Sequence, residues 1–466
     1  MKRTVKTFVC LILAVFTVVS AVCFAPTAPA LAATETLVVY NCADYLDLTL
    51  IEEFENYYKE VTGNNLKLVY STYDTNETMY TEVSKGDSSI DIIVPSEYAI
   101  QKLRDNNLIY KVSELWETYG TPLGLENPNR NGLVNSEIID KIDGIFGDMS
   151  DYTVPYMWGT LGIMYNAEYV TEEDLSAGWG IFWNVKDNPK LHHKILVKDS
   201  IRDTYAMAVL YLKEYDLLPD EYKGYTNQEL INCTDESFRK IVEQALKDQR
   251  DVIKGYEVDF GKDDLINGIA YVDLAWSGDA MYAIEEAAVD GVELGYYVPE
   301  IGSNIWFDGM CIPKTSKNPR AAVMFIEYMC RPISAVRNMY EIGYTSAVEV
   351  DKILADEEAM AFMAECYDEF SDEDKAYYGG VEAYIEEYFS DETRYPDATD
   401  PNLGVMQTFK DNDAMISMWE RVKAHGIFSW KLVVFFVIMV AAVFAAWGVS
   451  VLVRELRSRR RLLVKR

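Results

Sequence analysis

The chain has 466 residues, of which 49% are hydrophobic, so it is long enough for more than one hydrophobic core. Its 75 acidic residues against 43 basic ones give a formal net charge of -32. This balance argues against nucleic acid as a partner, because phosphate binding needs clustered lysine and arginine, and it is compatible with a cationic ligand. An acidic surplus alone identifies no site, since it usually forms a solvated surface.

The N-terminus has the pattern of a secretory leader. Lys2, Arg3 and Lys6 precede a long apolar run, and the small-residue stretch Ala30-Leu31-Ala32 follows it. A basic start, an apolar centre and an A-x-A ending are typical of a signal peptide that is removed on export. We therefore expect a signal peptide over 1–32 and a mature chain that begins near Ala33.

The next segment alternates strands with helices. Apolar stretches at 37–41, 66–72 and 89–96 predict strands, and helical spacing of apolar residues predicts a helix after each of them. Such alternation is typical of a parallel α/β sheet. Ligands of such sheets bind at the carboxyl ends of the strands, which directs attention to the residues that follow each stretch.

Local signals suggest where these helices begin and end. Thr49 and Glu52 have the spacing of a capping box, and Gly63 supplies a stop for the first helix. The second helix is expected from about Thr75 to Lys85, and Ser96 is a candidate cap for the third.

The last third of the chain has two contrasting segments. Residues 351–400 are strongly acidic and are expected to form exposed helices and loops. From Leu432 to Val453 there is no charged residue, a length of roughly 33 Å as a helix, enough to cross a bilayer. The final stretch, 454–466, is basic, which by the positive-inside rule predicts a cytoplasmic tail and places the body on the outer face of the cytoplasmic membrane.

Motifs for catalysis, cofactors and metals are absent from the sequence. It has no G-x-x-x-x-G-K-[ST], G-x-S-x-G, H-E-x-x-H or G-x-G-x-x-G pattern, and only three histidines. The five cysteines beyond the leader are scattered, without metal-type spacing, which argues against a disulfide framework and leaves one disulfide of unknown pairing as an open alternative. We therefore expect neither an enzyme nor a bound metal or cofactor. A hydrolase using paired acids stays open as an alternative.

Acidic and aromatic residues occur together at several predicted strand ends. The stretches are "NCADYLD" (41–47), "VPSEY" (94–98), "VKDSIRDTY" (197–205), "LAWSGDAMY" (274–282), "IWFDG" (305–309) and "EIGYTS" (341–346). In the fifth, Trp306 and Asp308 are two residues apart on a predicted strand and so share a face. An ammonium over an aromatic ring gains roughly 0.5–2 kcal/mol, and its burial requires a counter-charge. The mixture therefore indicates recognition of an organic cation.

Together with neighbouring stretches, these residues resemble the polyamine-binding (spermidine/putrescine) proteins of ABC importers. The matching stretches run in order from about residue 37 to 424: "VVYNCADYLD", "VYSTYDTNETMYTEV", "DIIVPSEYAIQKL", "YTVPYMWGTLGIMYN", "AWSGDA", "WFDGMCIPKTSKNP" and "EIGYTS". The resemblance implies an α/β, two-lobed periplasmic-binding-protein-like fold of type II with hinge crossovers, which closes on its ligand. It also implies a monomeric receptor that delivers a small-molecule polyamine to the permease subunits of an ABC importer.

The resemblance, together with the patterns at the two ends of the chain, gives an expected division of the chain. The expected C-terminal membrane anchor departs from the free periplasmic form of the family. The expected parts are a signal peptide (1–32), lobe 1 (33–156), lobe 2 (157–311), a return to lobe 1 (312–345), a helical region packed on the lobes (346–426), a single transmembrane helix (427–453) and a basic cytoplasmic tail (454–466).

By local match, twelve residues are expected to bind the ligand. They are Asp44, Tyr45, Ser96, Tyr98, Asp199, Asp203, Trp276, Asp279, Trp306, Asp308, Tyr344 and Gln407. The resemblance implies that Trp276 stacks on the carbon chain and that Trp306 and Asp308 hold an ammonium. It leaves open which of Asp199 and Asp203 contacts the ligand.

Two departures from the family pattern bear on ligand choice. Cys42-Ala43 stands where members usually have an aromatic residue followed by Thr or Ser, so one wall of the expected ligand site is smaller and less polar. The extra acid at Asp279 favours a short diamine, although the preferred polyamine stays open.

Other functions of the same fold also stay open. One is a sensor ectodomain that reports polyamine to a membrane partner, for which a 13-residue tail is short. Another is a receptor for an amino acid, thiamine or a chelated metal. An amino-acid carboxylate usually requires an arginine, and the only basic residues in the six stretches are Lys198 and Arg202.

Overall fold

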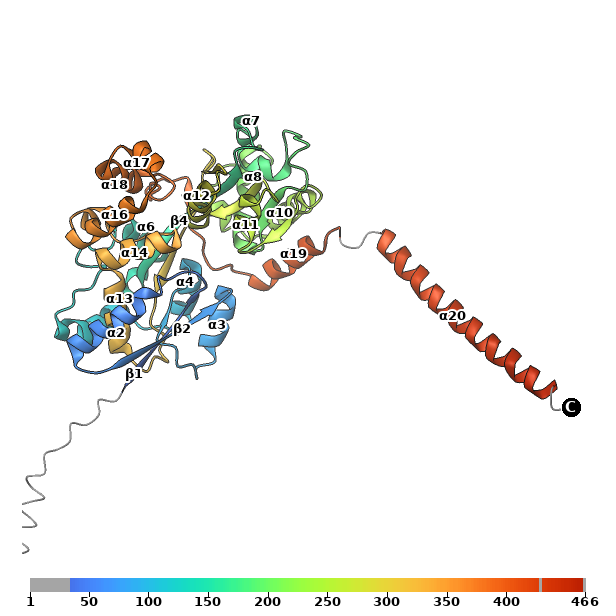
Figure 1. Cartoon of the computed structure of the whole chain (residues 1–466), viewed down its shortest axis with the longest axis horizontal. Helices are drawn as coiled ribbons and strands as arrows, with labels where there is room; N and C mark the ends of the chain where they lie inside the picture. The colour runs from blue at the N-terminus through green and yellow to red at the C-terminus, as the bar shows by residue number, and fades with distance from the viewer. Residues whose placement is uncertain (1–33, 427–429, 464–466) are drawn as a thin grey trace, which may run out of the picture.

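The computed structural model describes residues 34–426 and 430–463. The signal peptide expected over 1–32 lies outside these residues. Figure 1 shows two α/β lobes, with β1, β2, α2, α3, α4 and α13 in one and α7, α8, α10, α11 and α12 in the other. Two large hydrophobic clusters correspond to this division, one in each lobe.

The first lobe contains a parallel three-stranded sheet of order β2-β1-β3. Its elements in chain order are β1 (Glu35–Cys42), α2 (Thr49–Thr62), β2 (Leu66–Tyr73), α3 (Asn76–Ser84), β3 (Ile92–Ile93), α4 (Glu97–Asp105), α5 (Val112–Leu115) and α6 (Ser136–Phe146). Because all three strands are parallel, the loops after them emerge at the same edge, as the alternation of strands and helices predicts.

Two helix-end signals are confirmed, and two are not. Ser96 stands at the N-cap position of α4, but its side chain makes no capping hydrogen bond. Gly63 ends α2 in a left-handed conformation (φ 75°), and the Thr75 hydroxyl caps α3 by accepting from the backbone N–H of Thr78. The expected capping box of Thr49 and Glu52 does not form, because α2 begins at Thr49 itself. Asp47 takes over the capping role: its carboxylate accepts from the backbone N–H of Thr49 at 2.9 Å.

Strand β4 (Val154–Asn166) runs through both lobes. Its first half pairs antiparallel with β9 (Ser303–Met310) and with the short β10 (Thr345–Ser346). Its second half pairs with β7 (Val272–Trp276) and β8 (Leu294–Tyr297). One extended strand therefore carries the chain from one lobe into the other.

The second lobe is built on the order β4-β7-β5-β6. Its elements are α7 (Glu172–Leu175), β5 (Ile195–Lys198), α8 (Ile201–Glu214), α9 (Asn227–Ile231), α10 (Glu236–Gln249), β6 (Gly255–Glu257), α11 (Gly261–Ile266), β7 (Val272–Trp276), α12 (Ser277–Val289) and β8 (Leu294–Tyr297). Strands β5, β6 and β7 are parallel, so their carboxyl ends also share one edge.

One expected lobe boundary is corrected by the packing. The division placed 157–311 in lobe 2, but Ile305 to Cys311 pack in the core of the first lobe. The reason is the pairing of β9, which lies on the first half of β4 and forms bridges to Ile93 and Ser96. The return to lobe 1 therefore begins at β9, near residue 303.

After β9 the chain adds a helical layer. Its elements are α13 (Pro319–Met329), α14 (Pro332–Ile342), α15 (Val350–Leu354), α16 (Glu357–Glu369), α17 (Asp372–Tyr378), α18 (Val381–Ser390), β11 (Leu403–Gly404) and α19 (Asn412–Ala424). The acidic segment 351–400 is not merely exposed helices and loops. Met363, Tyr384 and Tyr388 are buried in the first core, because these helices also carry an apolar inner face.

The chain ends in a long helix, α20 (Trp430–Leu463), drawn apart from the lobes in Figure 1. Residues 434–451 have a mean hydropathy of 2.5, and their side chains are not buried against the rest of the described chain. By length and composition this helix is a candidate membrane span. The five cysteines within the described residues are all free, so none of them forms the one disulfide for which the sequence left room.

Candidate functional site

Residues that follow two strands of the first lobe meet Asp308, which lies within a third strand. Tyr45 follows β1, Ser96 follows β3, and Asp308 lies on β9 beside both. The hydroxyl of Tyr45 donates to Asp308 Oδ2 at 2.7 Å, and the backbone of Ser96 forms a bridge with that of Asp308. The three stretches that the strand-end rule singled out in this lobe thus converge.

Burial disfavours the ionised form of the two carboxyl groups in this part of the site. It raises the pKa of Asp308 to about 6, although hydrogen bonds from Tyr45 and Ser96 oppose the rise. Glu97, whose carboxylate accepts from the backbone N–H of Phe307 at 3.0 Å, has its pKa raised by burial to about 8. A cation beside Asp308 would restore the charged form of the carboxylate.

Aromatic rings surround the carboxylate. The ring of Tyr344 lies edge-on to those of Tyr45 and Trp306, with centroid distances of 4.9 Å and 5.7 Å, and Tyr45 also contacts Tyr156. The indole N–H of Trp306 is buried and has no hydrogen-bond partner in the protein. Trp306 and Asp308 border the same aromatic group, as their two-residue spacing predicts.

The second lobe adds two carboxylates and one indole at its own strand ends. Trp276 ends β7, and its Nε1 donates to Asp203 Oδ1, in the first turn of α8, at 3.3 Å. Asp279, in the first turn of α12, accepts a 2.8 Å hydrogen bond from the hydroxyl of Tyr344. That bond joins the two halves of the site across the lobes.

A glycine permits this close approach. A Cβ on Gly278 would lie 2.3 Å from the ring of Tyr344, so only glycine leaves room for the ring there.

Three basic side chains near the site already contact other groups of the protein. The Lys262 ammonium lies 3.9 Å from Asp279 Oδ1. The guanidinium of Arg202 lies 3.7 Å from the Tyr98 ring centroid and 4.1 Å from that of Phe409, and it donates to the carbonyl of Gln407 at 2.9 Å. The Lys198 ammonium is 2.6 Å from Glu257 Oε1. Lys198 therefore has a carboxylate partner within the protein, and Arg202 has a backbone carbonyl and two ring faces.

Three of the expected site residues are exposed to solvent or bind other parts of the protein. Asp44 is exposed in a left-handed turn (φ 48°). Asp199 accepts from Trp419 Nε1 at 3.1 Å and lies 3.3 Å from the Lys423 ammonium, so helix α19 engages it. Gln407 uses its backbone to bind Arg202. Of the two acids left open by the sequence, Asp203 is the one beside Trp276.

The structure also brings in residues that the sequence did not select. Asn76 Nδ2 donates to Ser96 Oγ at 3.1 Å and to the Tyr98 hydroxyl at 3.0 Å, which fixes both side chains. Asn76 lies in "STYDTNETMY", a stretch used for the resemblance, so a signal existed. Cys42 lies close enough to Asp308 that the carboxylate, after burial, contributes to raising the thiol pKa to about 12.

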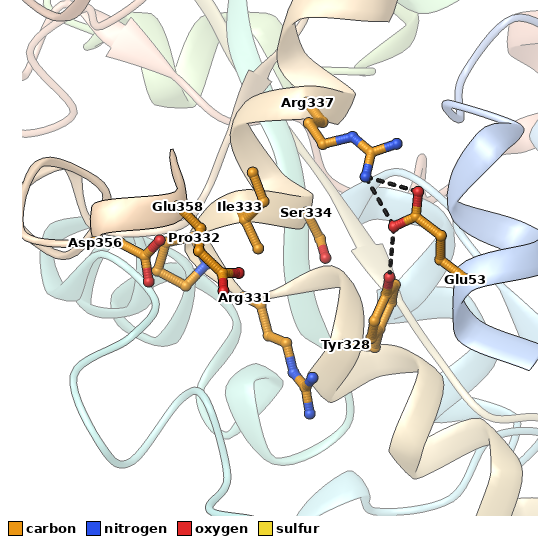
Figure 2. A pocket seen from close by; sticks show the side chains of 9 residues that line it. All are labelled: Glu53, Tyr328, Arg331, Pro332, Ile333, Ser334, Arg337, Asp356 and Glu358. Atoms are coloured by element: carbon orange, nitrogen blue, oxygen red, sulfur yellow. Dashed lines mark hydrogen bonds and ion pairs between the residues drawn. The ribbon is translucent and has the colours of Figure 1, made fainter. Parts of the chain in front are cut away.

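A separate pocket lies away from this site. It has a cavity volume of about 400 Å³, and its lining residues, drawn in Figure 2, are Glu53, Tyr328, Arg331, Pro332, Ile333, Ser334, Arg337, Asp356 and Glu358. Arg337 is paired with Glu53, and Arg331 is paired with Glu327. With its cations paired and none of the expected residues in its lining, this pocket is not the candidate site. Within the described residues no group of acidic, histidine or cysteine side chains is arranged to hold a metal.

Comparisons with known proteins agree with this geometry. The chain is 27% identical over 329 residues to the spermidine/putrescine-binding periplasmic protein of Salmonella typhimurium, covering 70% of this chain and 81% of the relative. It is also 27% identical over 306 residues to the putrescine-binding periplasmic protein SpuD of Pseudomonas aeruginosa, covering 64% and 74%.

A solved structure of a related binding protein has the same fold. The spermidine/putrescine ABC transporter substrate-binding protein PotD of Streptococcus pneumoniae superimposes with a TM-score of 0.57 at 26% identity, covering 84% of this chain and 99% of PotD. The family model described as bacterial extracellular solute-binding protein matches residues 49–353. The chain therefore belongs to the bacterial extracellular solute-binding proteins, which are substrate-binding transport proteins rather than enzymes, and it has their two-lobed type II fold.

Proposed function

We propose that this protein captures a polyamine, putrescine or spermidine, and delivers it to the permease of an ABC importer. The observation that carries the proposal is the convergence of three carboxylates, Asp203, Asp279 and Asp308, on one group of aromatic rings. The relatives named for spermidine and putrescine support the same ligand class.

The chemistry of the site favours an organic cation over an anion. Ligand ammonium groups, with a pKa near that of lysine, about 10.4, stay charged at neutral pH and match buried carboxylates. The rings of Trp276, Trp306 and Tyr344 suit the methylenes between charges. Lys198 is paired with Glu257 and Arg202 donates to the carbonyl of Gln407, which disfavours both as partners of an amino-acid carboxylate.

In this proposal the protein acts by selecting its ligand and by closing the two lobes around it. The site draws on both lobes, so a ligand bound there would contact Asp308 on one side and Asp203 on the other, and it would stabilise the closed arrangement. No bond of the ligand is made or broken.

We further propose that export removes residues 1–32 and that α20 anchors the protein to the outer face of the cytoplasmic membrane, with the basic end of α20 on the cytoplasmic side. Support comes from the leader pattern, from the exposed apolar stretch 434–451 and from the basic residues that follow it. Such an anchor would keep the receptor beside its permease.

Calorimetric titration of the full chain in detergent tests the ligand. We expect one-to-one binding of putrescine or spermidine, and no heat with the neutral analogue 1,4-butanediol. Asp308→Asn should weaken polyamine binding at least about tenfold, since hydrogen bonds to charged groups contribute about 1.5–3 kcal/mol. Asp220→Asn, whose side chain is 99% exposed, is the matched control and should bind as wild type. Equal affinity of Asp308→Asn and wild type would show the site assignment to be wrong.

A further inference from the structure

A buried lysine lies against the proposed ligand site. Lys198 ends β5 and is 2% exposed. Its ammonium is 2.6 Å from Glu257 Oε1, 3.5 Å from Asp279 Oδ2 and 2.9 Å from the carbonyl oxygen of Val258. It also lies 4.6 Å from the centroid of the Trp276 ring.

These contacts have the chemistry expected of a bound polyamine nitrogen. An ammonium in such a site needs carboxylates and the face of an aromatic ring, and Lys198 has both. Two of its partners, Asp279 and Trp276, are residues of the proposed ligand site. The ammonium of Lys198 therefore occupies the position beside Asp279 and Trp276 that a ligand ammonium would otherwise take.

The fold builds this arrangement from four neighbouring elements. Lys198 and Glu257 are register partners at the ends of the parallel strands β5 and β6, while Asp273 lies on β7 and Asp279 at the start of α12. Asp273 is fully buried, and neither of its carboxylate oxygens has a hydrogen-bond partner. A Cβ on Gly261 would lie 2.2 Å from Asp273 Oδ2, so glycine is required beside the cluster.

The charges explain why the lysine stays protonated. Burial alone would lower the pKa of Lys198, but Asp273, Asp279 and Glu257 together outweigh it and raise the pKa above the usual lysine range. Burial raises the pKa of Asp273 well above its ordinary value, against the opposing effect of Lys198. A permanent cation is therefore held at this end of the site.

We propose that Lys198 is a specificity-determining residue: its ammonium permanently occupies one cation position of the site, so that the site takes a diamine in preference to a triamine. The inference rests on the proposed polyamine function. Asp203 and Asp308 remain for the two ammonium groups of a diamine. Asp279, the acid that would receive a third, already lies 3.5 Å from the Lys198 ammonium and 3.9 Å from the Lys262 ammonium. A longer polyamine would have to leave one ammonium without a carboxylate or displace the lysine.

The test is calorimetric titration of the full chain in detergent with putrescine, spermidine and butylamine, for wild type and for Lys198→Met. Methionine keeps an unbranched chain of similar length and removes the charge. We expect wild type to bind putrescine at least tenfold more tightly than spermidine, and Lys198→Met to raise the ratio of spermidine to putrescine affinity at least tenfold. Butylamine, with one ammonium, should bind weakly to both.

Two further variants keep the test decisive. Lys194→Met is the matched control: the Lys194 ammonium lies 4.6 Å from the Tyr271 ring centroid, the same distance as in the Lys198–Trp276 pair, but outside the site, and its loss should leave the ratio unchanged. If Lys198→Met does not fold, the charge-balanced Lys198→Met/Asp273→Asn variant replaces it.

Each outcome separates the two proposals. Wild type that binds neither amine would overturn the polyamine function itself. Wild type that prefers spermidine, or a lysine variant that binds both amines with the wild-type ratio, would overturn the role of Lys198 and leave the polyamine function standing.

Discussion

Asp308 is a carboxylate whose charge state depends on what lies beside it. Tyr45 and Ser96 stabilise its ionised form, but burial prevails and places its pKa at about 6, near physiological pH. In the folded protein without ligand, Asp308 therefore binds a proton more tightly than in the unfolded chain. Its contribution to folding stability is present at low pH and is lost as the pH rises from its ordinary value near 3.8 through about 6.

Ligand binding should show the opposite pH dependence. A cationic ligand competes with the proton on Asp308, so polyamine affinity should fall by about tenfold per pH unit as the pH drops below about 6. Titrations of the full chain from pH 5 to 8 measure this slope. The Asp308→Asn variant should lose the slope, and a slope that persisted in it would assign the titration to another acid.

Gly278 is the second residue on which the site geometry depends. Gly278→Ala would place a methyl group 2.3 Å from the Tyr344 ring. The ring would have to move, which would break the hydrogen bond between Tyr344 and Asp279 that joins the two lobes. We expect a loss of about 1–3 kcal/mol in unfolding free energy, as is usual for overpacking, together with weaker ligand binding. Gly224→Ala is the control, since nothing lies within 4 Å of its added Cβ. Equal melting temperatures for the two variants would contradict the expected clash.

At the scale of elements, helix α19 connects the site to the C-terminus. Its apolar face, with Met415, Met418, Trp419 and Val422, packs into the core of the second lobe. Arg421 forms a two-pronged ion pair with Glu243 of α10, which lowers the pKa of that carboxyl to about 2. The helix that precedes the candidate membrane span is thus fixed to the second lobe.

Trp419 should carry much of this attachment. Its ring lies 4.8 Å from that of Tyr256, and its N–H binds Asp199 at the end of β5. Trp419→Ala should cost about 3–5 kcal/mol of unfolding free energy, the usual range for removing a large buried aromatic residue. Denaturant titration measures the loss. Ile416→Ala on the exposed face of the same helix should change it little, and similar losses for both would refute the packing role of Trp419.

At the scale of the whole molecule, several segments cross between the lobes. Strand β4 passes from one to the other, and the stretch after β11 does so again. There Val405 lies in the first core and Phe409 in the second, and Thr408 donates to the carbonyl of Tyr98 at 2.7 Å. These crossings allow hinge motion while keeping the two halves of the site in register.

Removing α20 should separate binding from localisation. The full chain should sediment with membranes and resist alkaline carbonate, whereas a chain that ends at Gly426 should be released in soluble form. Putrescine affinity should agree within about twofold, since a bilayer-spanning helix makes no contribution to the site. Extraction of the full chain by carbonate would argue against an anchor.

The sequence predicted the alternation of strands and helices, the positions of Tyr45 and Ser96 after strand ends, and the shared face of Trp306 and Asp308. These features depend on local periodicity and on the rule that parallel strands end together. It misplaced the cap of α2 and the lobe boundary near 311, because capping by Asp47 and the pairing of β9 with β4 depend on neighbours that local spacing does not reveal.

The sequence by itself therefore determined the class of the fold and the family, and it predicted a candidate site rich in acids and aromatic rings. Only the tertiary structure decided how each charge is used. Asp199 and Asp203 are four residues apart, yet one binds α19 and the other binds Trp276. The role of Lys198 could be inferred only from the carboxylates that the fold places around its ammonium. The balance of burial and charge there depends on residues distant in sequence.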